Sequence, residues 1–180
     1  FIVNALMTRC SKIPSLAPFS SMFIEILEPP KSAVYSKEQW ENKLRCVSSR
    51  LDILINKFRF AKIVEDTSEQ KAATKEIFSE INDTISQFTK NNPSFPDPST
   101  KKRIKDLRFD LYLKYAEIAS LAVGKIFNDS TNKKILQNAY KNACVVRENS
   151  LSGSNIEKRA NSIISTLQQI SPNFEVHFET

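Results

Sequence analysis

The fold is decided by residues 36–64, which read SKEQWENKLRCVSSRLDILINKFRFAKIV. Apolar residues recur there at alternating steps of four and three, which places them on one face of a long helix. They are Trp40, Leu44, Val47, Leu51, Leu54 and Phe58. Ser36 and Gln39 have the spacing of a capping box, which satisfies backbone N–H groups at a helix start. We therefore expect a central helix that begins sharply and packs along this apolar face.

The composition extends this expectation to the whole chain. A length of 180 residues suits one domain, and only two glycines, Gly124 and Gly153, occur in it. Several strands joined by tight turns would need more glycine, so helices are favoured. No apolar run reaches the roughly 20 residues that a membrane-spanning helix needs. We predict a soluble all-α fold: a single antiparallel helical bundle of five or six helices, two of them long.

Three segments surround the central helix in the first half of the chain. Residues 1–14 have no clean period and are either an extended arm or part of a helix. Residues 15–28 predict a short helix, and we expect its inward side chains to be Leu16, Phe19, Phe23, Ile26 and Leu27. Residues 67–91 predict a third helix, and the very short connection before it predicts an antiparallel hairpin with the central helix.

The second half begins at residues 91–99, NNPSFPDPS, where three prolines exclude a helix and predict a stiff loop. Helices are expected over 100–127, 128–148 and from Ser154 to Pro172, the last with a capping box formed with Glu157. Phe174, Val176 and Phe178 then alternate with polar residues, which predicts an extended tail. The expected organisation is an arm at 1–14, a helical bundle at 15–172 and a C-terminal tail at 173–180.

Signatures of catalysis are absent from the sequence. His177 is the only histidine, and neither a metal-binding spacing nor a glycine-rich phosphate loop occurs. Carboxylates do form two helical stripes, which are read as solvated ion-pairing surfaces rather than as a buried pair. They are Glu69, Glu76, Glu80 and Asp83, and then Asp106, Asp110 and Glu117. No catalytic residue, metal or cofactor is assigned, and a non-enzymatic role is favoured.

The cysteines and glycosylation triplets bear on the compartment. Cys10, Cys46 and Cys144 are odd in number and widely spaced, so they are read as small apolar residues, with a Cys46–Cys144 bridge as the alternative. The triplets beginning at Asn82 and Asn128 matter only if the chain is secreted. An intracellular location is favoured over secretion, and the oligomeric state is left open.

Two basic clusters are the candidate binding residues, on a chain of net charge +6. Lys57, Arg59 and Lys62 lie at the end of the central helix, where cations complement the helix dipole. A second cluster begins the fourth helix, where like charges are disfavoured; it consists of Lys101, Lys102, Arg103 and Lys105. Free backbone N–H groups beside these cations predict a site for phosphate or carboxylate.

These features lead to three expectations about function. The first is a non-catalytic helical interaction domain that binds a protein partner through a helical face or groove. The alternative is binding of nucleic acid or another polyanion through the cluster that starts the fourth helix. The second alternative is a secreted or membrane-active helical protein.

Overall fold

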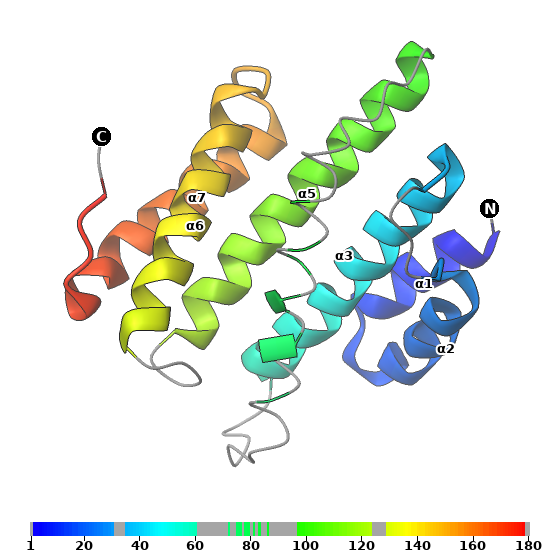
Figure 1. The fold of residues 1–180 in the computed structure, drawn as a ribbon, viewed down its shortest axis with the longest axis horizontal. Helices are drawn as coiled ribbons and strands as arrows, with labels where there is room; N and C mark the ends of the chain where they lie inside the picture. The colour runs from blue at the N-terminus through cyan, green and yellow to red at the C-terminus, as the bar shows by residue number, and fades with distance from the viewer. Residues whose placement is uncertain are drawn as a thin grey trace. The chain divides into compact units, whose positions relative to one another are not determined.

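The computed structural model describes residues 2–30, 35–60, 97–123 and 129–178, and eight separate residues between 72 and 86. Within this part of the chain it has six α-helices, two short 3₁₀ helices and no strand (Figure 1). The predicted all-α fold with two long helices is therefore confirmed. The chain divides into two compact units, Phe1–Leu111 and Tyr112–Thr180, and each is described by itself.

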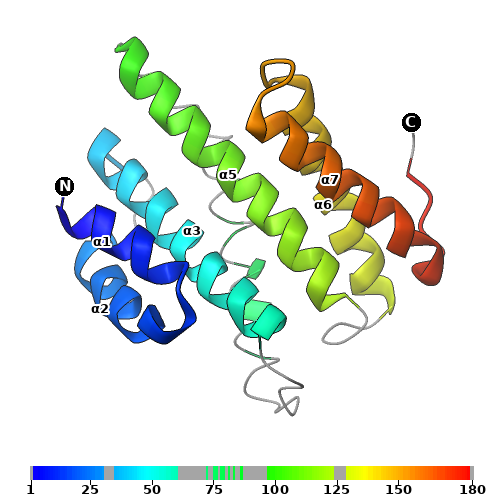
Figure 2. The same ribbon diagram turned by 180° about the vertical axis from the view of Figure 1, so that it is seen from behind.

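The first unit begins with a hairpin of two short helices, α1 (Ile2–Ser11) and α2 (Ala17–Leu27). A 3₁₀ turn, η1 (Pro14–Leu16), joins them, and Ser20 Oγ donates a hydrogen bond of 3.0 Å to Met7 O across the hairpin. The N-terminal segment is thus helical, which decides between the two alternatives that the sequence allowed. Both helices pack against the long helix α3, described next (Figure 1 and Figure 2).

The central helix α3 (Lys37–Phe60) starts with the predicted capping box. Ser36 N donates to Gln39 Oε1 at 2.9 Å, and Gln39 N donates to Ser36 Oγ at 3.2 Å. The predicted apolar face is buried wherever its side chains are described, at Trp40, Leu44, Val47 and Leu51. The side chains of Leu54 and Phe58 lie outside the described part. Ile55, which the seam prediction omitted, is also buried.

The third predicted helix, at 67–91, and its hairpin with α3 fall largely outside the described residues. The separate residues that are described there are helical. Ile81 is buried, as its place in the predicted apolar row requires, and Phe78 is buried beside that row.

The fourth predicted helix is α5 (Pro98–Ala122), whose residues up to Leu111 belong to the first unit and the rest to the second. It begins two residues earlier than expected because Pro98 occupies the first turn, where the missing N–H of proline costs nothing.

The second unit adds α6 (Asp129–Glu148) and α7 (Asn155–Ile170). As predicted, Ser154 caps α7, since Ser154 Oγ accepts a hydrogen bond of 3.2 Å from Glu157 N. The Glu157 carboxylate, however, accepts from Gly153 N rather than from Ser154 N. The predicted inward face of α7 is buried at Ala160, Ile163, Ile164 and Leu167.

The C-terminal segment packs on α6. After the short 3₁₀ helix η2 (Ser171–Phe174), the described residues 175–178 are not helical. Val176 is buried, and the Phe178 ring stacks on Tyr140 with centroids 4.1 Å apart. The predicted extended tail is therefore wrong at Asn173 and Phe174, which lie in η2, whereas Val176 and Phe178 pack on this unit.

Candidate functional site

The predicted basic cluster at the start of α5 lies on the surface. Lys101, Lys102, Arg103 and Lys105 are all exposed. Arg103 Nε lies 3.5 Å from Glu41 Oε1, and Lys105 Nζ lies 5.2 Å from the centre of the Phe109 ring. Within the described residues, Lys101 and Lys102 have no ion-pair partner. Two of the four cations therefore have partners on the surface of the first unit.

The helix end that this cluster was expected to share with a bound anion already holds a carboxylate. Asp97 Oδ2 accepts hydrogen bonds from Thr100 Oγ1 at 2.5 Å and from Thr100 N at 2.9 Å. The two bonds, from the hydroxyl and then from the N–H, lower the pKa of Asp97. A negative side chain at a helix start complements the dipole. This internal cap weakens the argument for an external anion, and binding by Lys101 and Lys102 stays a prediction.

The other basic cluster cannot be placed in the same way. The side chains of Lys57 and Arg59 lie outside the described part, and so does the whole of Lys62.

The carboxylates and cysteines have separate surroundings. Asp110 accepts a hydrogen bond of 2.7 Å from Ser48, and Glu117 lies 3.6 Å from Arg159. Among the described residues, no group of three or more His, Cys, Asp or Glu side chains could hold a metal ion. Cys10, Cys46 and Cys144 are free thiols.

An ionic contact fixes the orientation of α2. Glu28, at its C-terminal end, accepts a hydrogen bond of 3.1 Å from Lys43 Nζ and one of 2.9 Å from Arg50 Nη1. Burial raises the pKa of Glu28, but the hydrogen bonds and charges of Arg50 and Lys43 outweigh burial and lower it overall. On the same side of α2, Ile24 packs in a buried cluster with Met7 and Cys46. One side of α2 is thus held by α1 and α3.

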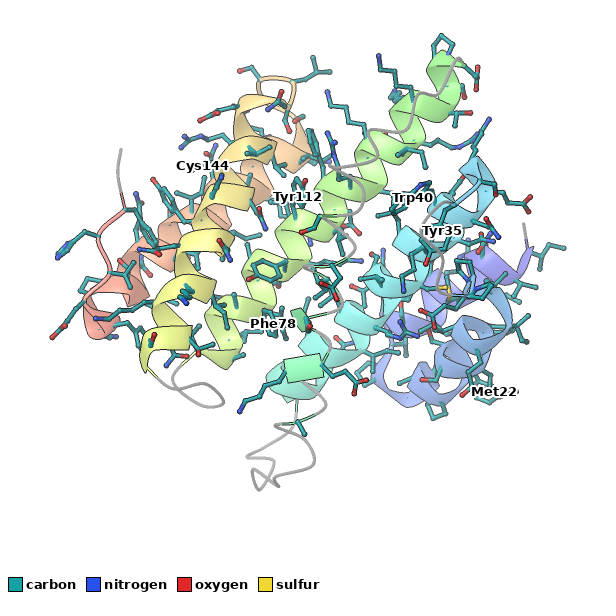
Figure 3. All side chains as sticks on the ribbon, viewed as in Figure 1. Met22, Tyr35, Trp40, Phe78, Tyr112 and Cys144 are labelled. Carbon is teal, nitrogen blue, oxygen red and sulfur yellow. The ribbon has the colours of Figure 1, made fainter. Side chains whose placement is uncertain are left out.

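The opposite side of α2 is apolar and exposed, which sequence reasoning missed. Phe19 is 54% exposed, Met22 57% and Ile26 70%. The prediction that Phe19 and Ile26 point inward was therefore wrong. Small Ser20 lies inward instead, because α1 comes close there and the Met7 carbonyl satisfies its hydroxyl. Figure 3 shows Met22 on the side of α2 that faces away from α3.

Helix α1 contributes to the same surface through Ile2, 73% exposed, and Leu6, 43% exposed. Asn4 and Ser11 bond to α3 and mark the side of α1 that faces it. With 100° between successive residues, Ile2 and Leu6 lie away from that side, next to the side of α1 that faces α2. On α2, the exposed stripe likewise lies next to the side of the helix that faces α1, and Phe23 lies between the stripe and the buried residues. We call this surface the hairpin face; it consists of Ile2, Leu6, Phe19, Met22 and Ile26.

Exposed apolar side chains concentrate in this hairpin. The structure describes seven exposed large apolar residues, and only Leu151 belongs to the second unit. The other six are Ile2, Leu6, Ile13, Phe19, Met22 and Ile26. A signal for this surface was present in the sequence, because residues 16–27 are apolar nearly all the way round the helix.

Within the described residues, no helix is both long enough and apolar enough to cross a membrane. Comparison of the chain with protein-family models, with curated proteins and with solved structures found no match.

Proposed function

We propose that the chain binds a protein partner through the hairpin face. The observation that supports this proposal is the exposed apolar stripe of Phe19, Met22 and Ile26 on a helix whose other side is already buried. Together with Ile2 and Leu6, these side chains present several hundred Å² of apolar surface, roughly the largest patch that a typical monomer exposes. Patches of this size commonly mark an interaction site.

The stripe has the spacing that a helical interface uses. Phe19, Met22 and Ile26 follow one another at steps of three and four, so they form one ridge along α2. An apolar helix of a partner can pack against such a ridge. Aromatic and methionine side chains are enriched in the centres of protein interfaces, and methionine adapts its shape to the partner.

The folded first unit cannot bury this stripe by turning α2. Rotation of α2 would expose Ile24. It would also separate Glu28 from Lys43 and Arg50 and so break their ion pairs. Apolar contact with another molecule is therefore the favourable way to remove the stripe from water. This argument favours protein binding over polyanion binding, since Asp97 already occupies the helix start at the basic cluster.

Affinity capture from an extract of the source organism tests the proposal, with the tagged chain as bait. We expect Met22→Lys to abolish capture of the partner and Gln169→Lys to leave it unchanged. Gln169 is the matched control because it is an exposed residue of α7 and receives the same charge. Capture that ignores Met22→Lys contradicts the proposal. Capture that instead depends on Lys101 and Lys102, and falls steeply with salt, supports the polyanion alternative.

A further inference from the structure

We infer that the partner bound at the hairpin face is a second copy of this chain, an inference that rests on the proposed function. The reason is the distribution of charge along the two edges of the face. One edge is basic and the other is acidic, and a two-fold axis can bring the unlike edges together.

Arg9 forms the basic edge. It is exposed and follows Leu6 by three residues and Ile2 by seven, so it continues the exposed stripe of α1 on the side away from α2. Lys12, exposed in the turn after α1, adds a second cation at this end.

Glu25 forms the acidic edge. It is exposed and follows Met22 by three residues, on the side of α2 away from α1. Within the described residues, neither Arg9 nor Glu25 has an ion-pair partner. In the proposed dimer, each pairs with a group on the other copy.

Two-fold symmetry is the reason why a second copy of the chain complements both edges. In a two-fold dimer the same surface of both copies meets, so if one residue contacts a second, the second also contacts the first. An axis that lies in the plane of the hairpin face, midway between Arg9 and Glu25 and perpendicular to the line joining them, exchanges these two residues. Arg9 of each copy then lies against Glu25 of the other, while the apolar residues between them pack together. A partner with one uniform charge would complement only one edge.

The dimer is expected to be weak. Helices α1 and α2 have 10 and 11 residues, so each is only about 15 Å long and the buried area is small. Interfaces of this size belong to the low-affinity class, so we expect a dissociation constant in roughly the micromolar range.

Sedimentation equilibrium across a wide range of concentration tests the inference with the intact chain. We expect wild type to form dimers, and Met22→Lys to raise the dissociation constant about tenfold or more. Arg9→Glu and Glu25→Arg should each weaken self-association severalfold, because each places like charges together twice per dimer. An equimolar mixture of these two variants should associate as wild type does, because both pairs are then opposite in sign. Circular dichroism confirms that each variant is folded.

Two results would overturn the inference. One is a wild-type chain that stays monomeric throughout the concentration range. The other is a mixture of Arg9→Glu and Glu25→Arg that associates no better than either variant alone. The capture experiment separates the two proposals: a monomeric chain with Met22-dependent capture of another protein refutes only the dimer. A monomeric chain without Met22-dependent capture refutes the proposed function as well.

Discussion

The two helical hairpins of this protein, α1–α2 in the first unit and α6–α7 in the second, solve the same packing problem with different surfaces. Every exposed residue of α7 is polar: Asn155, Lys158, Asn161, Ser162, Ser165, Thr166, Gln168 and Gln169. Half of the exposed residues of α2 are large and apolar, namely Phe19, Met22 and Ile26, beside Pro18, Ser21 and Glu25. Helix α7 thus has one apolar face, and α2 has two.

This difference separates an apolar face that stabilises the fold from one that, in our proposal, binds another molecule. In α7 the apolar stripe is as wide as the core contact requires, which is typical of a helix on the surface of a folded unit. In α2 the inner face is already filled by Ile24 and Ser20, so more than half of each side chain in the outer stripe stays exposed. This excess of apolar surface on a short helix is the observation on which the proposed contact with another molecule rests.

The largest expected effect comes from emptying the core side of the α6–α7 hairpin. Leu167→Ala removes a fully buried side chain and leaves a cavity, so we expect it to lower the free energy of unfolding by about 2–5 kcal/mol. Thr166→Ala, one residue away and exposed, should change it by less than about 0.5 kcal/mol. Urea unfolding followed by circular dichroism measures both. Equal effects of the two substitutions would contradict the assigned burial of α7.

A smaller effect is expected from the ionic contact that orients α2. Glu28→Gln removes the charge that Lys43 and Arg50 bind. We expect this substitution to lower the free energy of unfolding by about 1–3 kcal/mol at neutral pH. The pKa of Glu28 is lowered in the folded state, so the charged form stabilises the fold above its ordinary pKa of 4.5. That contribution is lost as pH falls below 4.5 towards the folded pKa.

The measurement for Glu28 is urea unfolding of wild type and Glu28→Gln from neutral pH to below 4.5. The difference in the free energy of unfolding between wild type and Glu28→Gln should shrink as the pH falls, because protonation removes the charge of Glu28. The other titrating groups are the same in both proteins, so their effects cancel. Glu25→Gln, in the same helix but exposed, is the matched control and should change the free energy of unfolding by less than about 0.5 kcal/mol at neutral pH in dilute solution. A difference between wild type and Glu28→Gln that stays constant with pH would refute the assigned ionic contact.

The sequence was sufficient to predict those helices that have a single apolar face, because that face packs on the core. For α3, the capping box of Ser36 and Gln39 and the burial of Trp40 and Leu44 follow from spacing alone. For α2 the same method failed, because it assumes that the largest apolar residues point inward. Which side of a uniformly apolar helix is buried depends on the neighbouring helices, and that information is tertiary.

The candidate site shows the same limit of sequence-based prediction. The charges of Lys101 and Lys102 could be read from the sequence, and their exposure follows from them. The prediction of free N–H groups beside them depended on where α5 begins. A start at Pro98 makes Asp97 the capping residue, and this shift of two residues places an acid where an anion was expected. Helix ends carry errors of about this size in any sequence-based prediction.

The smallest expected effect sharpens the comparison most. Ile26→Ser replaces a large apolar side chain that is 70% exposed, so its contacts in the isolated chain are few. We expect the free energy of unfolding to change by less than about 0.5 kcal/mol in dilute solution, where the chain is not associated. The matched comparison is Ile164→Ser in α7, which buries a hydroxyl in an apolar core and should cost several times more. Urea unfolding at low protein concentration measures both variants. If Ile26→Ser were as costly as Ile164→Ser, the outer stripe of α2 would be part of the fold, and the hairpin face would not be free to bind a partner.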